Sequence, residues 1–161
     1  MIKIYTGTRA PDGCRVTVQA FSEDHVQTTR PDGETTVTRL LMVAGPAEPL
    51  RHVVWHSPTG FEWGYHGSGP ADLALSILAD HFGERQTPTE ARAFDAERCP
   101  QAARYHQAFK REIIAELPGP TVVVAPEFAW TLESTAVDAW IAGKRREEET
   151  RPLSQAAGSP Q

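Results

Sequence analysis

The chain has 161 residues, of which 40% are apolar and 23% are charged, and its formal net charge is -5. These values are typical of one globular domain that buries a core without metal or disulfide support. The acidic balance argues against direct nucleic-acid binding, because contact with the phosphate backbone requires clustered lysine and arginine.

The first part of the chain is rich in β-type residues that are separated by turn signals. Two Pro-Asp-Gly turns, at 11–13 and 31–33, punctuate it. The runs that flank the first turn alternate and predict a hairpin. We expect strands at 2–9, 14–21, 34–43, 50–56 and 61–65.

A central hairpin is predicted around the turn Ser57-Pro58-Thr59-Gly60. Pro58 presets the first central position of a type I turn, and Gly60 can adopt the left-handed conformation that follows it. This loop length pairs 50–56 with 61–65 and sorts the side chains onto two faces. One face carries Val53, Trp55, Phe61, Trp63 and Tyr65, and the other carries His52, Val54, His56, Glu62, Gly64 and His66.

Helical periodicity begins after this hairpin. Residues 70–82 predict a largely buried helix that Gly83 ends, with Asp72, Ser76 and Asp80 as one polar stripe at a spacing of four. A second helix is expected at 101–117, with an apolar stripe. That stripe contains Ala102, Tyr105, Phe109, Ile113 and Leu117.

The last part of the chain predicts short strands at 121–124 and around 128–132, followed by a helix from Thr135. The final residues are polar and contain proline and glycine, so we expect a single domain at 1–149 and a disordered tail at 150–161. The predicted fold class is α+β. It comprises an antiparallel sheet of about five strands with two to three helices packed on one face.

The polar face of the predicted hairpin is the first candidate site. His52, His56 and Glu62, around a hollow left by Gly64, have the side chains for acid–base catalysis or for holding a divalent metal. The alternative is a solvent-facing sheet surface, or a purely structural bond between His56 and Glu62. Strand spacing is a weaker signal than a helical metal motif, so we assign no metal and no cofactor.

The Gly-Ser-Gly turn before the first helix is the second candidate. Gly67, Ser68 and Gly69 precede a helix N-terminus, where free backbone N–H groups attract anions. With Gly64 and His66 they form the predicted binding residues. The alternative is a simple helix cap, and Asp72 nearby would repel a phosphate. The spacing of a phosphate-binding loop or a dinucleotide fingerprint is absent.

Two cysteines, Cys14 and Cys99, lie far apart in the sequence and in no Cys-x-x-Cys pair. Neither they nor the serines have the surroundings of a catalytic nucleophile. The N-terminus lacks the pattern of a secretory signal, and no stretch approaches the roughly 20 apolar residues that cross a bilayer. We therefore expect a cytoplasmic protein without membrane contact.

Residues 57–78, SPTGFEWGYHGSGPADLALSIL, resemble the signature of an uncharacterised family of small proteins from bacteriophages, plasmids and their bacterial hosts. The similarity covers most of residues 1–142. It continues in the same order through YTGTR at 5–9, YHQAFKREIIAELP at 105–118 and WTL at 130–132. The resemblance implies no catalytic residues, because the family has no assigned chemistry. His66 stands where this family commonly has glycine, which weakens a three-histidine site, and the segments 23–48 and 121–129 are longer than usual.

Two functional hypotheses follow. The first is a non-enzymatic protein of a mobile genetic element that binds a protein partner, such as an inhibitor of a host defence complex of the CRISPR type. The resemblance supplies the link to mobile elements, and the residues supply no catalytic constellation. The second is a small enzyme or metal-binding domain that uses His52, His56 and Glu62.

Overall fold

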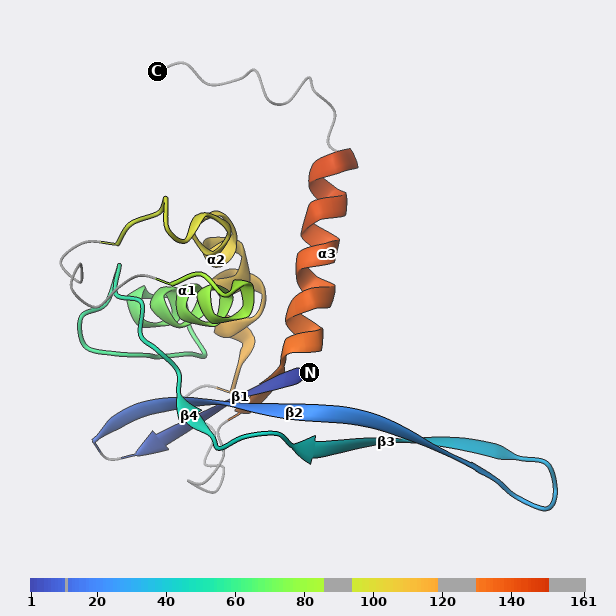
Figure 1. Cartoon of the computed structure of the whole chain (residues 1–161). Helices are drawn as coiled ribbons and strands as arrows, with labels where there is room; N and C mark the ends of the chain where they lie inside the picture. Colours follow the sequence, from blue (N-terminus) through green and yellow to red (C-terminus); the bar gives the residue numbers. More distant parts are fainter. Residues whose placement is uncertain (11, 86–93, 119–129, 151–161) are drawn as a thin grey trace.

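An antiparallel sheet forms the base of the molecule, and three α-helices lie over one of its faces (Figure 1). The computed structural model describes residues 1–10, 12–85, 94–118 and 130–150. The strands are β1 Ile2–Ala10, β2 Gly13–Thr29, β3 Thr35–Val43, β4 Glu48–Pro49 and β5 Trp130–Glu133. The helices are α1 Ser68–Phe82, α2 Pro100–Glu112 and α3 Ser134–Thr150, with a 3-10 turn, η2, at Ile114–Glu116. This single α+β domain confirms the predicted fold class.

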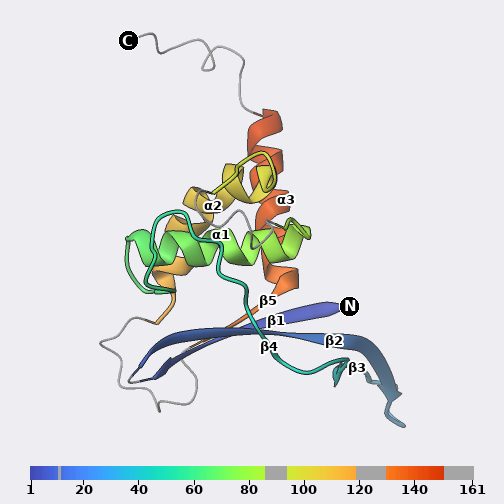
Figure 2. The ribbon, with the colours of Figure 1, turned by 60° about the vertical axis from the view of Figure 1, so that its left-hand side comes forward.

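The strands are ordered β3-β2-β1-β5 across the sheet, and the short β4 also pairs with β2. The predicted first hairpin is confirmed, since β1 and β2 pair from Ile2 opposite Phe21 to Ala10 opposite Gly13. The other side of β1 pairs with β5, so the first and last strands are neighbours (Figure 2). The Lys3 N–H donates to Ser134 Oγ at 3.0 Å and ties β1 to the start of α3.

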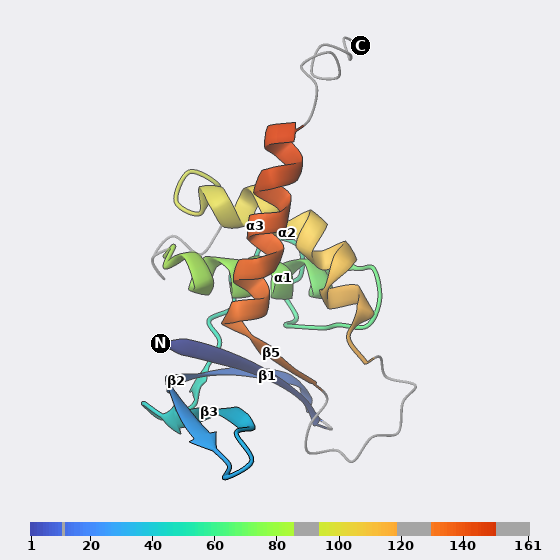
Figure 3. The same cartoon turned by 90° about the vertical axis from the view of Figure 1, so that its right-hand side faces the viewer.

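The second hairpin is longer than the sequence indicates. β2 continues beyond residue 21 to Thr29 and pairs with β3 from Phe21 opposite Val43 to Thr29 opposite Thr35. The turn at 31–33 joins them, as predicted. We call residues 22–43 the β2–β3 arm, because this two-stranded ribbon projects beyond the helical layer (Figure 1); Figure 3 shows the arm nearly end-on, below the helices.

The predicted pairing of 50–56 with 61–65 is wrong, because residues 50–66 contain no strand. The turn itself is present at Pro58 and Thr59, and Gly60 has a positive φ of 118°. The flanking backbone N–H groups are used elsewhere. The Val53 N–H donates to Ser76 Oγ at 2.9 Å, and the Gly64 N–H donates to the Ile114 carbonyl at 3.0 Å.

Helix α1 is the centre of the core. It begins at Ser68 after Gly67 and ends at Gly83, whose φ of 68° confirms its predicted role as the terminating residue. Apolar side chains from both layers pack around it. They include Tyr5 and Val16 from the sheet, Leu73, Leu75, Ile77 and Leu78 from α1, Tyr105 and Phe109 from α2, and Val137 and Ile141 from α3.

The other two helices lie close to their predicted positions. Pro100 occupies the first turn of α2, and the Glu84 carboxylate accepts the N–H groups of Gln101 and Ala102 at 3.0 Å each. This remote carboxylate complements the positive end of the helix dipole. Helix α3 continues through Thr150, where the disordered tail was predicted to begin. The rest of that tail and the predicted strand at 121–124 lie outside the described residues.

Candidate functional site

The polar stripe of α1 is buried and holds other parts of the chain in place. Asp72 and Ser76 are almost completely buried, and each accepts backbone N–H groups from the loop that precedes the helix. Asp80, one turn further on, accepts Lys3 Nζ and the Tyr5 hydroxyl, both at 2.8 Å. Burial, reinforced by the Asp80 carboxylate, raises the pKa of Tyr5, so this hydroxyl is a neutral donor. One helix face therefore anchors both β1 and the loop.

Asp72 makes the most concentrated set of these contacts. Its carboxylate accepts the N–H groups of His56 at 2.8 Å, Ser57 at 2.9 Å and Trp55 at 3.2 Å. His52 Nε2 lies 3.2 Å from the same carboxylate. Burial alone would raise the pKa of Asp72, but the hydrogen bonds from His52 and the loop more than offset it, and the pKa is lowered. The carboxylate is thus ionised and fixes the backbone of the loop.

This loop places His56 against a histidine of α2. His56 Nε2 and His106 Nε2 are 3.2 Å apart, and the two rings stack with centroids 5.4 Å apart. Trp55 lies over both imidazoles and stacks on Phe94 at 4.3 Å. His106 is only 3% exposed, whereas 44% of Trp55 is exposed. We call these four residues the His56–His106 cluster.

The predicted site residues do not all belong to this cluster. His52 contacts Asp72 and the Phe61 ring, at 4.7 Å between ring centroids. Glu62 instead pairs with Arg9 at 3.0 Å, and the Arg9 guanidinium lies 4.4 Å from the centre of the Trp63 ring. Of the three predicted catalytic candidates, only His56 faces another histidine in the structure. Within residues 1–10, 12–85, 94–118 and 130–150, no group of three or more His, Cys, Asp or Glu side chains is arranged to hold a metal.

The Gly-Ser-Gly turn makes close contacts with its neighbours. A Cβ added to Gly69 would come 2.8 Å from Glu62 Cβ, and one added to Gly67 would come 2.5 Å from the Tyr65 ring. Ser68 and His66 are exposed, and Gly64 has a positive φ of 80°. The glycines at 67 and 69 therefore have a packing role as well as a place at the start of α1. Asp72 lies beyond the first turn, and its carboxylate faces the loop instead.

Neither cysteine is activated as a nucleophile. Burial and the nearby Glu62 carboxylate raise the pKa of Cys14 to about 11. Burial likewise raises the pKa of Cys99, which precedes α2. A thiol must lose its proton to attack, so both side chains remain unreactive thiols at neutral pH.

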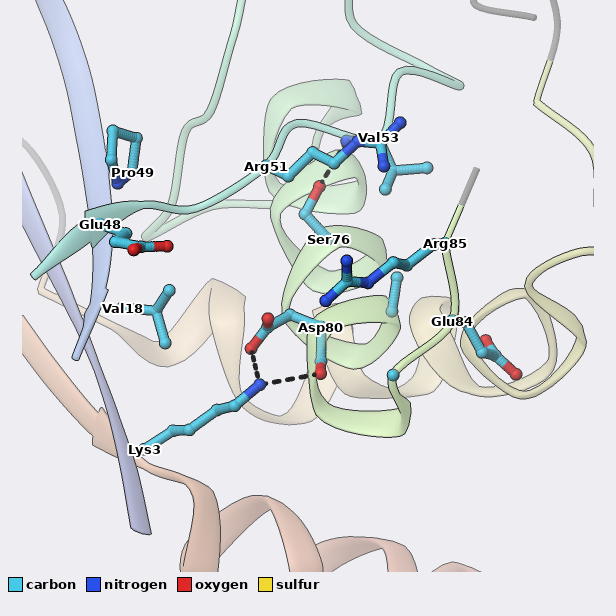
Figure 4. Close-up of a pocket in the computed structure, with 12 residues that line it drawn as sticks. Lys3, Val18, Glu48, Pro49, Arg51, Val53, Ser76, Asp80, Glu84 and Arg85 are labelled. Carbon is cyan, nitrogen blue, oxygen red and sulfur yellow. Dashed lines mark hydrogen bonds and ion pairs between the residues drawn. The ribbon is translucent and has the colours of Figure 1, made fainter. Parts of the chain in front are cut away.

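A pocket of about 250 Å³ lies between the sheet and the C-terminal half of α1 (Figure 4). Lys3 and Asp80 pair inside it, while Glu84 is engaged by the N-terminus of α2. Arg51, Arg85 and Glu48 line the same pocket and form no ion pair with a described residue. The charges of the wall are balanced, so the pocket does not select a ligand of one sign.

The β2–β3 arm carries five of the nine large hydrophobic side chains that are exposed among the described residues. The paired positions place Val26, Leu40 and Met42 on one face of the ribbon, which continues from the helix-covered side of the sheet. Val37 and Val43, which are 60% and 64% exposed, lie on the other face. β3 is also an edge strand of the described sheet, so its outer backbone groups have no strand beside them there.

Fold and surface together define a small α+β domain with a buried anchoring helix, a histidine–aromatic cluster and a projecting apolar arm. No curated protein and no solved structure matches the chain. A family model described as a family of unknown function, DUF6166, matches residues 5–143, and the chain belongs to this family. None of the described helices combines the length and the apolar character needed to span a membrane.

Proposed function

We propose that the protein acts by binding another protein, and that the β2–β3 arm is the contact surface. The observation that carries this proposal is the projection of five large apolar side chains on a two-stranded ribbon without a helix over it. Isolated ribbons of two strands are marginally stable in water. Three of them, Val26, Leu40 and Met42, share one face of the ribbon, and exposed apolar side chains grouped in this way are typical of an interaction site.

The free edge of β3 indicates the chemistry of the partner. Natural edge strands are protected by lysine, proline or a bulge. β3, with the sequence TTVTRLLMV, contains neither lysine nor proline. Its only charged side chain, Arg39, is already paired with Glu23 at 2.7 Å and with Glu133 at 2.9 Å. The edge therefore suits an extended segment of a partner protein that adds a strand and presents apolar side chains.

The resemblance to proteins of phages and plasmids supports a narrower version of this proposal. The partner is then a host defence complex in the bacterial cytoplasm, such as a CRISPR effector, which the protein inhibits by occupying a surface. Expression in a host with an active defence system is expected to raise the efficiency of plating of a targeted phage. Unchanged plating in every defence background would contradict the inhibitor role while leaving partner binding to be tested separately.

Substitution on the arm tests the binding surface directly. The double variant Val37→Lys/Met42→Lys adds two charges to exposed apolar positions, and we expect the affinity for a purified partner to fall by about tenfold or more. The partner is first identified by pulldown from a bacterial host, and affinity is then measured by calorimetry. Stability should be unchanged, because both side chains are largely exposed.

The matched control is Ala136→Lys/Ala139→Lys, which adds the same charge at two exposed positions of α3, outside the arm. This control should keep at least most of the affinity. Equal affinities for wild-type protein and the apolar-site variant would place the interface elsewhere. Absence of any stable partner in the pulldown, together with unchanged phage plating, would overturn the proposal as a whole.

A further inference from the structure

The outer edge of β3 fits a second copy of the same chain. We propose that two molecules of the free protein associate by antiparallel pairing of their β3 strands, with Leu40 of one copy opposite Leu40 of the other. The two sheets then form one continuous sheet around a two-fold axis at this residue. The inference rests on the same exposed arm as the proposed function, but it requires no foreign protein.

The hydrogen bonds at the two ends of the arm show which backbone groups of β3 face outward. The Ala44 N–H donates to the Ala20 carbonyl at 2.9 Å, and the Arg30 N–H donates to the Glu34 carbonyl at 2.8 Å. Even-numbered residues of β3 therefore direct their backbone groups toward β2, and odd-numbered residues direct theirs to the outer edge. The outward-facing groups belong to Thr35, Val37, Arg39, Leu41 and Val43.

Pairing about Leu40 brings exposed apolar side chains together. Val37 lies opposite Val43 of the second copy, and both are outward-facing residues that can exchange N–H to C=O bonds. On the other face, Met42 lies diagonal to Leu40 of the second copy, within reach of a long side chain. These side chains are 41–64% exposed in the single chain, so each gains apolar neighbours across the axis.

The adjacent registers are less favourable. The two-fold axis can move by one residue along β3 without mixing the faces of the sheet. With the axis at Arg39, two arginine side chains lie opposite each other, and like charges directly opposite are destabilising. With the axis at Leu41, Val37 lies opposite Gly45 of the second copy, and the contact between valines is lost. The sequence of the strand therefore selects the axis at Leu40.

The shape of the molecule leaves room for this arrangement. The arm projects beyond the helical layer, and no described helix covers it (Figure 1). Antiparallel pairing sets the turn at 31–33 of each copy beside the base of the other arm. The two helical layers consequently lie at opposite ends of the paired strands and do not collide. The nine residues of β3 give a contact line of about 30 Å on each copy.

Disulfide trapping tests the register. Leu40 at the axis forms a pair without mutual hydrogen bonds, in which the Cα atoms are about 4.5 Å apart, within the range of a disulfide. Leu40→Cys should therefore give a covalent dimer on a non-reducing gel after mild oxidation with oxidised glutathione. Thr38→Cys lies on the same face, but its counterpart is about 13 Å away along the strand, so it should remain mostly monomeric. Equal trapping of the two variants, or preferential trapping of Thr38→Cys, would overturn the proposal.

Sedimentation tests association without a cross-link. The mass of the full chain should rise from monomer to dimer as its concentration increases to about 300 µM, since an interface of this size is at the weaker end of protein contacts. Leu40→Lys sets two positive charges opposite each other at the axis and should weaken dimerisation by about tenfold or more. Ala136→Lys, at an exposed position of α3, is the matched control and should dimerise like the wild-type protein. A wild-type chain that stays monomeric over this range would overturn the proposal.

Both tests use the purified protein alone, so their failure would remove the dimer and leave the proposed binding of a foreign partner intact. Failure of the pulldown and plating experiments would likewise leave the dimer in place. Where both associations hold, a partner segment that adds a strand to β3 displaces the second copy. The apparent affinity for that partner should then fall as the protein concentration rises above the dimer dissociation constant.

Discussion

Replacement of Asp72 by alanine is expected to lower the free energy of unfolding by about 3–5 kcal/mol, because it removes a buried charged acceptor from several donors at once. The N–H groups of Trp55, His56 and Ser57 would lose their partner, and so would the His52 ring. Urea unfolding followed by circular dichroism measures the change. The loop would also cease to hold His56 against His106.

Ser76→Ala is the matched control on the same helix face. It removes one neutral acceptor, for the Val53 N–H, and we expect a loss of about 1–2 kcal/mol. Asp72→Asn keeps one acceptor oxygen and should lie between the two. A loss for Asp72→Ala no larger than that for Ser76→Ala would show that water replaces the carboxylate without difficulty.

The lowered pKa of Asp72 gives the same interaction a pH dependence. The folded state binds this proton less readily than the unfolded state, so the contribution of Asp72 to stability is complete above its ordinary pKa. It is lost as the pH falls through the lower pKa of the folded state. Asp72→Asn should therefore show a shallower loss of stability in acid than the wild-type protein.

A second large effect is expected at Gly7, where β1 passes beneath an indole ring. A Cβ at this position would overlap the Trp130 side chain, and Trp130 itself is buried and meets Trp63 edge-on. Gly7→Ala must displace the indole or the strand pairing of β1 with β5. We expect a loss of about 3 kcal/mol, near the upper end for overpacking of a core. Urea unfolding is again the measurement.

A double-mutant cycle separates this overlap from a general effect of alanine. With Trp130→Leu as the background, Gly7→Ala should cost about 1 kcal/mol or less, because the smaller side chain leaves room for the methyl group. Gly45→Ala is the control, since no atom of the described residues lies within 4 Å of the added Cβ. Its effect should stay within about 0.5 kcal/mol. Additive losses in the cycle would contradict the steric explanation.

The parts of the fold that follow from local signals could be predicted. The turn at 11–13 and the alternation around it give the β1–β2 hairpin, and Gly83 ends α1. The absence of a hairpin across 50–66 could not be predicted in this way, because Asp72 and Ser76 of the following helix α1 accept backbone N–H groups of this segment. A signal was nevertheless present in the stripe of Asp72, Ser76 and Asp80 on a mostly apolar helix. Polar groups on a buried helix face need partners, and here the partners are the loop and β1.

The contact between His56 and His106 could not be predicted from the sequence for a different reason. His56 and His106 are 50 positions apart, and no local pattern connects a loop residue with one on α2. His106 does follow Ala102 by one helical turn and precedes Phe109 by another, so it lies within the apolar stripe of its helix. A histidine in such a stripe is expected to be buried with a partner, but the identity of that partner depends on how α2 packs on the loop. The length of the arm could not be predicted for a similar reason. Polar and apolar side chains alternate only weakly in residues 22–29, and these residues form a strand through their pairing with β3.

The position of β1 between its hairpin partner and the last strand has a consequence for the order in which the sheet assembles. The β1–β2 pair closes across a short turn, whereas the bond between Lys3 and Ser134 joins groups 131 positions apart. Because the entropy of loop closure grows with the logarithm of loop length, the junction of β1 with β5 is the more costly one to form from an open chain. Helix α1 is bound to β1 through Asp80, and α2 packs on α1. We infer that these two helices bring β1 and β5 close together and so lower the entropic cost of pairing them. Helix α1 then contributes to the assembly of the sheet as well as to the core of the folded protein.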